Sequence, residues 1–306
     1  MMRRAVATLA ALVVVVTACG GDDSSSTGNV GFGVGGDSTP TSAGAGAPGD
    51  DSGSADGLTG GDRPSGPQGP TPGSQDRPSG GDGNTTAGMP SPAGPPGSFA
   101  PAYLRPEPAS TIVVELHSQN DAAIRDSTRD QLVAALDDVT GKRIGVEGPH
   151  PFSDDRTRWR AEEIRALADQ NGRRDHGGGV AVMRVLLLRG EYEQADVIGV
   201  AVRGAVMAIF VDEVRRAGSF VSGSRQIEAA VVIHEAGHLM GLVDLYLGTG
   251  REDPDHPGHS TNEESVMYWA VESSLVGQLL GAGPPTGFDQ DDRRDLAAIA
   301  GGAGPG

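Results

Sequence analysis

Two kinds of hydrophobic pattern run through the chain between about residue 106 and residue 301. Short runs of aliphatic and β-branched residues, such as 111–117 and 180–188, predict strands that are buried on both faces. Longer stretches in which apolar residues recur every three or four positions predict helices with one packed face. In chain order the predicted elements are strand 111–117, helix 120–140, strand 143–146, helix 156–171, strands 180–188, 197–203 and 205–211, helix 225–240 and helix 288–300. The pattern predicts one globular domain, long enough to bury a substantial core.

Residues at the ends of these segments agree with that assignment. Asn120 offers a side chain that caps the first predicted helix, and Gly141 and Gly172 each follow the last residue of a predicted helix. Gly204 alone separates the last two predicted strands. We therefore expect those two strands to form a hairpin.

The first 19 residues are typical of a secretory signal. Two arginines precede an apolar run that is too short to span a bilayer comfortably. The run ends in Val-Thr-Ala-Cys, which resembles the lipobox of bacterial lipoproteins, where the cysteine is lipidated. The resemblance implies a lipid anchor on Cys19 and a protein held outside the cytoplasm on the bacterial cell membrane. The alternative is an incidental thiol in a cleaved peptide.

Residues 20–105 are rich in Gly, Ser, Pro, Thr and Asp and contain few large apolar side chains. Such a composition cannot bury a core. We therefore predict a disordered linker that connects the anchor to a folded domain at 106–301, with a flexible tail at 302–306. An alternative interpretation is a pro-segment that blocks a cleft of the domain until it is removed.

The balance of charge excludes one class of partner. The chain has 24 Lys and Arg against 41 Asp and Glu, a formal net charge of −17. Nucleic-acid binding requires a basic surface, so we expect no nucleic-acid partner. Cys19 is the only cysteine, so the mature domain has no internal disulfide. We expect the protein to be a monomer.

The stretch that carries chemistry begins at His234 and reads His-Glu-Ala-Gly-His-Leu-Met-Gly-Leu-Val-Asp. On a helix, His234 and His238 lie four residues apart on one face, where both imidazoles can reach a single metal ion. Glu235 lies beside them and could take a proton from a metal-bound water. Gly241 can end the helix and return Asp244 as a third ligand. The alternative is an amphipathic helix with exposed histidines.

This motif, followed by Ser-Val-Met-Tyr at 265–268, resembles the metzincin family of zinc proteases. The resemblance implies an α+β zincin fold: a mixed twisted sheet of about five strands, an active-site helix, a Met-turn and a C-terminal helix. It implies that Met267 lies beneath the zinc ion without binding it, and that Glu235 is the general base and then the general acid. The usual metzincin has His where this chain has Asp244, but proteases of the snapalysin type are similar in having Asp there.

Other residues near the motif leave alternatives open. The loop 252–259 contains both carboxylates and imidazoles. His256 or His259 could replace Asp244 as the third zinc ligand, and the loop carboxylates could bind Ca²⁺ at a second site. A solvated acidic loop is the third interpretation.

Tyr268 and Tyr246 are candidates to hydrogen-bond the oxyanion of a tetrahedral intermediate. Metzincins that use a tyrosine near the Met-turn place it two residues after the methionine, whereas Tyr268 follows Met267 directly. Packing is the alternative role for both side chains.

The sequence therefore predicts a zinc-dependent endopeptidase that hydrolyses protein or peptide substrates through a metal-activated water and is tethered at the cell surface. We expect an extended substrate to pair with the edge strand 197–203. A surface binding module that contains zinc but lacks turnover is one alternative. A zinc amidase that acts on cell-wall peptides is the other.

Overall fold

The computed structural model describes residues 88–306, apart from 220–223 and 281–282. The predicted signal peptide, Cys19 and most of the predicted linker lie outside the described residues. Within the described part of the chain, no helix has both the length and the apolar character that a membrane crossing requires.

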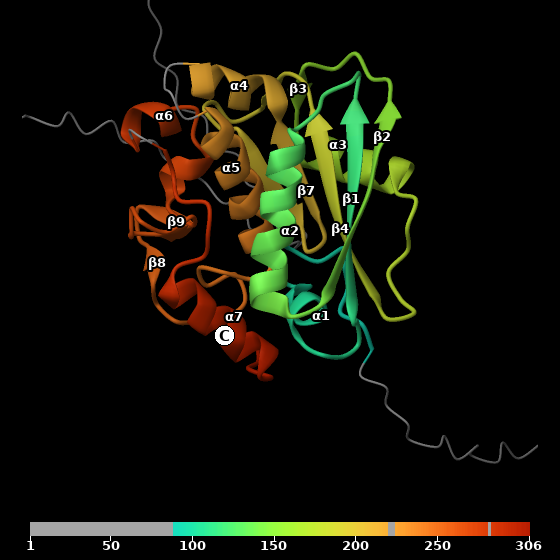
Figure 1. The fold of residues 1–306 in the computed structure, drawn as a ribbon, viewed down its shortest axis with the longest axis vertical. Coiled ribbons are helices and arrows are strands. Elements are labelled where there is room, and N and C mark those ends of the chain that lie inside the picture. Colours follow the sequence, from blue (N-terminus) through green and yellow to red (C-terminus); the bar gives the residue numbers. More distant parts are fainter. Residues whose placement is uncertain (1–87, 220–223, 281–282) are drawn as a thin grey trace, which may run out of the picture. The chain divides into compact units, whose positions relative to one another are not determined.

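A five-stranded mixed sheet forms the centre of the fold, in the order β2-β1-β4-β7-β6 (Figure 1). Four neighbouring strands are parallel, and β6 runs antiparallel to β7. The strands of this sheet are β1 (Thr111–Gln119), β2 (Arg143–Phe152), β4 (Val180–Leu188), β6 (Gly199–Arg203) and β7 (Val206–Phe210). All five predicted strands are thus confirmed, as is the hairpin of the last two.

Helices cover both faces of the sheet. The larger apolar cluster lies under α2 (Asp126–Thr140) and α5 (Ser224–Leu239), and the smaller one lies under α3 (Ala161–Asn171). Figure 1 shows α2 and α5 in front of the sheet and α3 behind it. The remaining elements are α1 (Ala100–Leu104), β3 (Arg158–Trp159), β5 (Glu191–Tyr192), α4 (Val211–Ser219), β8 (Glu252–Asp253), β9 (His256–Ser260), η1 (Trp269–Glu272), α6 (Val276–Leu279) and α7 (Gln290–Ala300).

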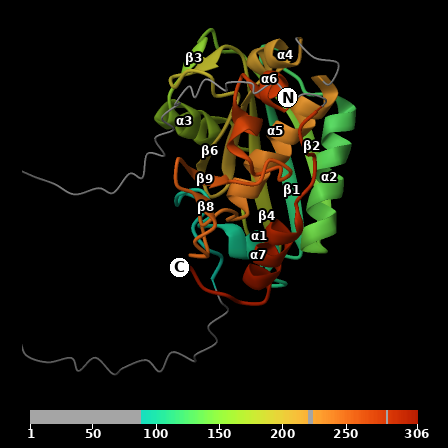
Figure 2. The same cartoon turned by 90° about the vertical axis from the view of Figure 1, so that its left-hand side faces the viewer.

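Helix α5 is enclosed by other elements: it contacts α2, α4, β6, β7 and η1. Ile227, Val231, Val232 and Ile233 are fully buried on different sides of it. Burial of each such side chain stabilises the fold by about 1.5–3 kcal/mol. Their weak helix propensity costs less than about 1 kcal/mol each, so packing decides the helical conformation here. The last helix, α7, packs on α1 and α2 instead; Figure 2 shows these elements in a second view.

The folded part begins before residue 106, where the linker was predicted to end. Phe99, Tyr103 and Leu104 are buried in the larger cluster, and the Tyr103 hydroxyl donates to the carbonyl of Val182. At the other end, the backbone N–H of Gly306 donates to the carbonyl of Tyr246, so the predicted flexible tail also contacts the domain. Local composition did not reveal these contacts because they are made with residues distant in sequence.

Two predicted helices begin five or more residues later than expected. Asn120 does not cap the first one, because Asn120 and Asp121 adopt left-handed backbone conformations and α2 begins at Asp126. Its first turn is satisfied instead by the buried Glu228 of α5, whose carboxylate accepts hydrogen bonds from the backbone N–H of Arg125 and the hydroxyl of Thr128. The predicted helix 156–171 begins at residue 161, since 158–159 pair with β5.

Candidate metal centre

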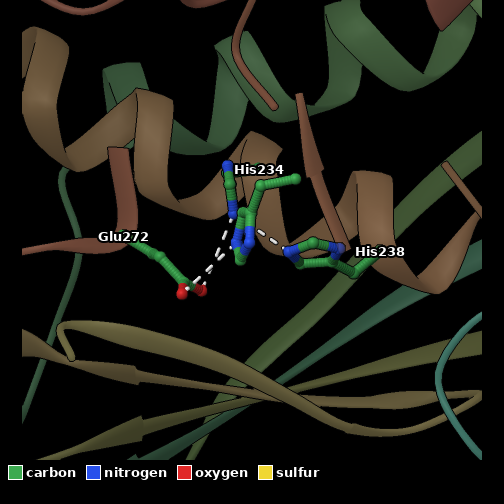
Figure 3. Close-up of side chains that lie close together, drawn as sticks. His234, His238 and Glu272 are labelled. Atoms are coloured by element: carbon green, nitrogen blue, oxygen red, sulfur yellow. Dashed lines mark hydrogen bonds and ion pairs between the residues drawn. The ribbon is translucent and has the colours of Figure 1, made fainter. Parts of the chain in front are cut away.

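Helix α5 places the two histidines of the motif on one side, one turn apart. His234 and His238 are both buried, and their Nε2 atoms lie 3.0 Å apart (Figure 3). The Nδ1 of His234 lies 2.7 Å from the carbonyl oxygen of Val266, which can only accept. The proton of His234 therefore resides on Nδ1, which leaves the lone pair of Nε2 directed toward His238.

The third imidazole comes from β9. His259 is buried, and its ring stacks on that of His234 at 5.2 Å and lies 5.1 Å from that of His238. Its Nδ1 lies 3.2 Å from the carbonyl oxygen of Pro257, which leaves Nε2 free to face the other two rings. The alternative that His259 supplies a ligand is thus the one that the geometry favours.

Asp244 does not join this group, which corrects the predicted third ligand. Its backbone is left-handed, with φ of 64°, and its carboxylate accepts hydrogen bonds from the backbone N–H groups of Thr249 and Gly250 and from the Thr249 hydroxyl. Burial acts to raise the pKa of Asp244, but these hydrogen bonds outweigh it and lower the pKa. Asp244 therefore organises the loop that follows α5.

A fourth donor, absent from the sequence prediction, is the carboxylate of Glu272 at the end of η1. Its Oε1 lies 3.3 Å from Nε2 of His259, and its Oε2 lies 3.7 Å from Nε2 of His234 (Figure 3). Burial opposes ionisation, but the two imidazoles prevail and hold the pKa of Glu272 far below its ordinary value. No local motif marks this residue; only its place five positions after Met267 could have drawn attention to it.

The donor set fits a divalent transition metal. One ligand atom from each of His234, His238, His259 and Glu272 lies within 4.8 Å of every other. Imidazole nitrogens and a carboxylate oxygen are the donors that Zn²⁺ accepts in tetrahedral sites. Lone pairs of buried imidazoles that face one another repel unless a cation lies between them. The backbone carbonyls behind His234 and His259 supply the outer support that metal-binding histidines require.

No protein-family model and no curated protein sequence matches the chain. Among solved structures, archaemetzincin from Methanopyrus kandleri is similar with 16% identity and a TM-score of 0.40, covering 62% of this chain and 95% of the other. Archaemetzincin from Archaeoglobus fulgidus, complexed with malonate, has 15% identity and a TM-score of 0.35, covering 62% and 99%. Metalloproteinase-II from Bacteroides fragilis has 14% identity and a TM-score of 0.37, covering 64% and 55%. Similarity at this level assigns no activity to the chain.

Glu235 lies next to the metal group but outside it. Its side chain is fully buried, and neither carboxylate oxygen has a hydrogen bond of normal geometry to a described residue. Burial raises the pKa of Glu235 well above its ordinary value; the charge of Glu272 adds to the rise, and the backbone N–H of Ala201 opposes it. A carboxylate in such surroundings holds a proton readily, as a general acid and base must.

Met267 lies directly against α5. A Cβ on Gly237 would lie 2.4 Å from the Met267 sulfur, so a larger residue there would require the methionine side chain to move. The backbone N–H of Met267 donates to the Ser265 hydroxyl, which in turn donates to the carboxylate of Asp292 in α7. Residues 265–267 are thus fixed between the metal-binding helix and the last helix.

The two candidate tyrosines have other contacts. The Tyr246 hydroxyl accepts a hydrogen bond from the Arg105 guanidinium at 3.3 Å, on the side where the C-terminal residues pack. The Tyr268 ring contacts the Trp269 ring at 5.7 Å. The oxyanion role of both therefore stays a prediction, with packing as the observed role.

The loop 252–259 forms the β8–β9 hairpin, and only His259 of this loop joins the metal group. His256 stacks on Trp269 at 4.3 Å and contacts the Asp253 carboxylate at 3.1 Å. Glu252 accepts a hydrogen bond from the backbone N–H of Gly258. Among the described residues, no group of three metal donors forms in this hairpin, so the predicted Ca²⁺ site gains no support.

A second group of metal-binding residue types lies on β1 and β2 and comprises Glu115, Glu147 and His150. Glu115 is ion-paired with Arg184 and Glu147 with Arg174. Because the two guanidinium groups already neutralise both carboxylates, this group is an ion-pair cluster rather than a metal site.

Proposed function

We propose that this chain is a zinc-dependent endopeptidase, carried at the cell surface by a lipid on Cys19. The observation that carries the proposal is the convergence of three imidazoles on one point, with the buried carboxylate of Glu235 beside them. His234 and His238 lie on helix α5, and His259 lies on strand β9 of the β8–β9 hairpin. This arrangement of donors and base is the one that metal-assisted peptide hydrolysis requires.

In the proposed mechanism His234, His238 and His259 hold the ion. When bound, zinc acidifies a water molecule and polarises a carbonyl oxygen. Glu235 accepts the proton of the attacking water and delivers it to the leaving amine nitrogen. Burial raises the pKa of Glu235, which favours its taking up a proton from water.

The edge strand β6 is the proposed place for the substrate backbone. Among the described strands it pairs only with β7, so its other edge can accept an extended peptide by strand addition. Gly199 brings this strand directly against Glu235, because a Cβ there would lie 2.6 Å from a carboxylate oxygen. A peptide that pairs with β6 would therefore pass close to the general base.

One observation favours the alternative of a zinc-containing binding module without turnover. With Glu272 the site offers four protein donors, and four donors close a tetrahedral site. A zinc amidase that acts on cell-wall peptides would use the same residues and differ only in substrate. The three functions are separated by turnover and by substrate.

The test is to incubate the full-length protein with an unstructured protein and with cell-wall peptides, with and without a chelator. We expect one zinc ion per chain and cleavage of the unstructured protein, abolished by the chelator. His259→Ala should lose the zinc and the activity, and Glu235→Gln should keep the zinc and lose the activity.

His256→Ala is the matched control, since this histidine lies in the same hairpin and stacks on Trp269 outside the metal group. It should keep both zinc and activity. Cleavage that survives both the chelator and Glu235→Gln contradicts the proposal. If the protein binds zinc but cleaves neither substrate, the binding-module alternative is supported. If it cleaves only the cell-wall peptides, the amidase alternative is supported.

A further inference from the structure

The feature that the proposed mechanism leaves unused is the Glu272 carboxylate. Ligands about 2.0–2.1 Å from a tetrahedral zinc ion lie about 3.3 Å from one another. The Glu272 oxygens lie 3.3 Å from His259 Nε2 and 3.7 Å from His234 Nε2, and the two motif histidines are 3.0 Å apart. The Glu272 carboxylate is therefore within reach of the fourth corner of such a tetrahedron, while Glu235 stands outside the donor group.

Among the described residues, no lysine or arginine pairs with the Glu272 carboxylate. Its side chain is only 13% exposed, and its ion-pair contacts among the described residues are with His234 and His259 alone. A carboxylate that is removed from water in this way needs a charge partner. A metal ion held by the same imidazoles meets that need.

The backbone of Glu272 is fixed to the start of the edge strand. Its carbonyl accepts a hydrogen bond from the backbone N–H of Ile198 at 2.9 Å, and Ser273 forms a β-bridge with Val197. The next residue, Ser274, donates from its backbone N–H and its hydroxyl to Asp196. The main chain therefore stays in place, and the carboxylate can leave the metal only by rotation of its own side chain.

We propose that Glu272 is a fourth protein ligand of the resting metal centre, occupying the position that the attacking water needs, and that the substrate must displace it. This inference rests on the proposed function, because it presumes a metal ion at the three histidines. It reconciles four donors with hydrolysis: the site is closed at rest and opens when the Glu272 side chain turns away. The Glu272 carbonyl is hydrogen-bonded to Ile198, directly before β6. A peptide that pairs with β6 would therefore lie next to the Glu272 side chain.

The test uses the full-length protein loaded with Co²⁺, whose visible absorption reports coordination number, and azide as a small competing ligand. If Glu272 occupies the fourth position, the apparent dissociation constant of azide is raised by the reciprocal of the open fraction. Glu272→Ala should then bind azide at least about tenfold more tightly than the wild type. It should also bind Co²⁺ at least about tenfold more weakly, the loss that changes outside the ligand shell already cause.

Glu264→Ala is the matched control, because this glutamate lies eight residues upstream, is exposed and stands outside the metal group. It should match the wild type in both affinities. Glu272→Gln keeps the size of the side chain and should behave as Glu272→Ala does, which separates ligand loss from a packing defect. Circular dichroism checks that all the variants are folded.

Two results overturn the inference: unchanged affinities for Co²⁺ and azide in both Glu272 variants, or weaker Co²⁺ binding with unchanged azide affinity. None of these readouts requires turnover. If azide binding tightens as expected but no substrate is cleaved, Glu272 is a ligand and the peptidase proposal fails. If peptides are cleaved and azide binding is unchanged, the peptidase proposal stands and the role of Glu272 fails.

Discussion

Adding a single methyl group at Gly199 should impair catalysis and leave metal binding intact. It lies in β6, opposite α5, and has an ordinary strand conformation that alanine also adopts. A Cβ at this position would lie 2.6 Å from Glu235 Oε1 and 2.8 Å from Val231 Cγ1. Gly199→Ala therefore acts through the space between strand and helix.

The size of the effect follows from these distances. Ordinary contact begins at 3.4 Å, so the Glu235 oxygen must retreat by 3.4 − 2.6 = 0.8 Å and the Val231 methyl by 3.4 − 2.8 = 0.6 Å. Val231 is β-branched and has little rotamer freedom in a helix, so the strain falls on Glu235 and on the spacing of α5 and β6. Overpacking of this kind costs about 1–3 kcal/mol of stability. Misplacement of a catalytic group by about 1 Å costs about 100-fold in rate.

The assay combines kcat for peptide hydrolysis, zinc content and urea unfolding. Gly199→Ala should lose about 100-fold in kcat and keep its zinc, since the metal donors are not contacted. Gly145→Ala is the matched control in β2, the opposite edge strand, where the nearest atom to a new Cβ is Val113 Cγ2 at 3.9 Å. It should leave kcat unchanged and leave stability unchanged or raised by up to about 1 kcal/mol. Wild-type kcat in Gly199→Ala would refute the assignment of Glu235 as the base held by this strand.

Three further predictions concern stability. Asp244→Ala should keep one zinc ion per chain, but its free energy of unfolding should fall by about 1–3 kcal/mol because the hydrogen bonds to the loop are lost. Loss of zinc from this variant would instead show that Asp244 is a ligand. Glu228→Ala should lower the free energy of unfolding, measured with urea, by about 2–3 kcal/mol, because the start of α2 loses the carboxylate that accepts its hydrogen bonds. An unchanged urea midpoint would contradict this. Burial and the neighbouring Asp289 raise the pKa of Asp292 to about 6, so its ionisation opposes folding. Wild-type stability relative to Asp292→Asn should therefore fall by about 1–3 kcal/mol as the pH rises from about 4 to about 6, and parallel curves would contradict this sign.

The parts of the fold that were predictable are those in which local pattern and tertiary burial agree. Strand β4 is apolar on nearly every residue because helices cover both faces of the sheet, and its bounds match the predicted 180–188. Helix α4 was not predicted, because it begins at Val211 directly after β7 with no turn residue between them. Its first residue therefore looked like the end of a strand.

The metal centre divides in the same way. His234, Glu235 and His238 could be identified because their spacing along one helix is a local property. His259 was only one of two alternatives to Asp244, and Glu272 was not identified, because a hairpin and a 3₁₀ turn bring them to α5 from 21 and 34 residues beyond His238. Asp244 had the expected spacing, but the hydrogen bonds of its own loop direct it elsewhere.

The hydroxyl of Ser265 joins the turn beneath the metal to the final helix through Asp292. All four metal donors precede Asp292 in the sequence, so they are synthesised before the residue that holds this turn in place. A chain that lacked the residues from 288 onward would keep every metal donor and would lose the Asp292 carboxylate that accepts from Ser265. The last helix therefore contributes to the Met267 turn without supplying a donor atom to the metal group.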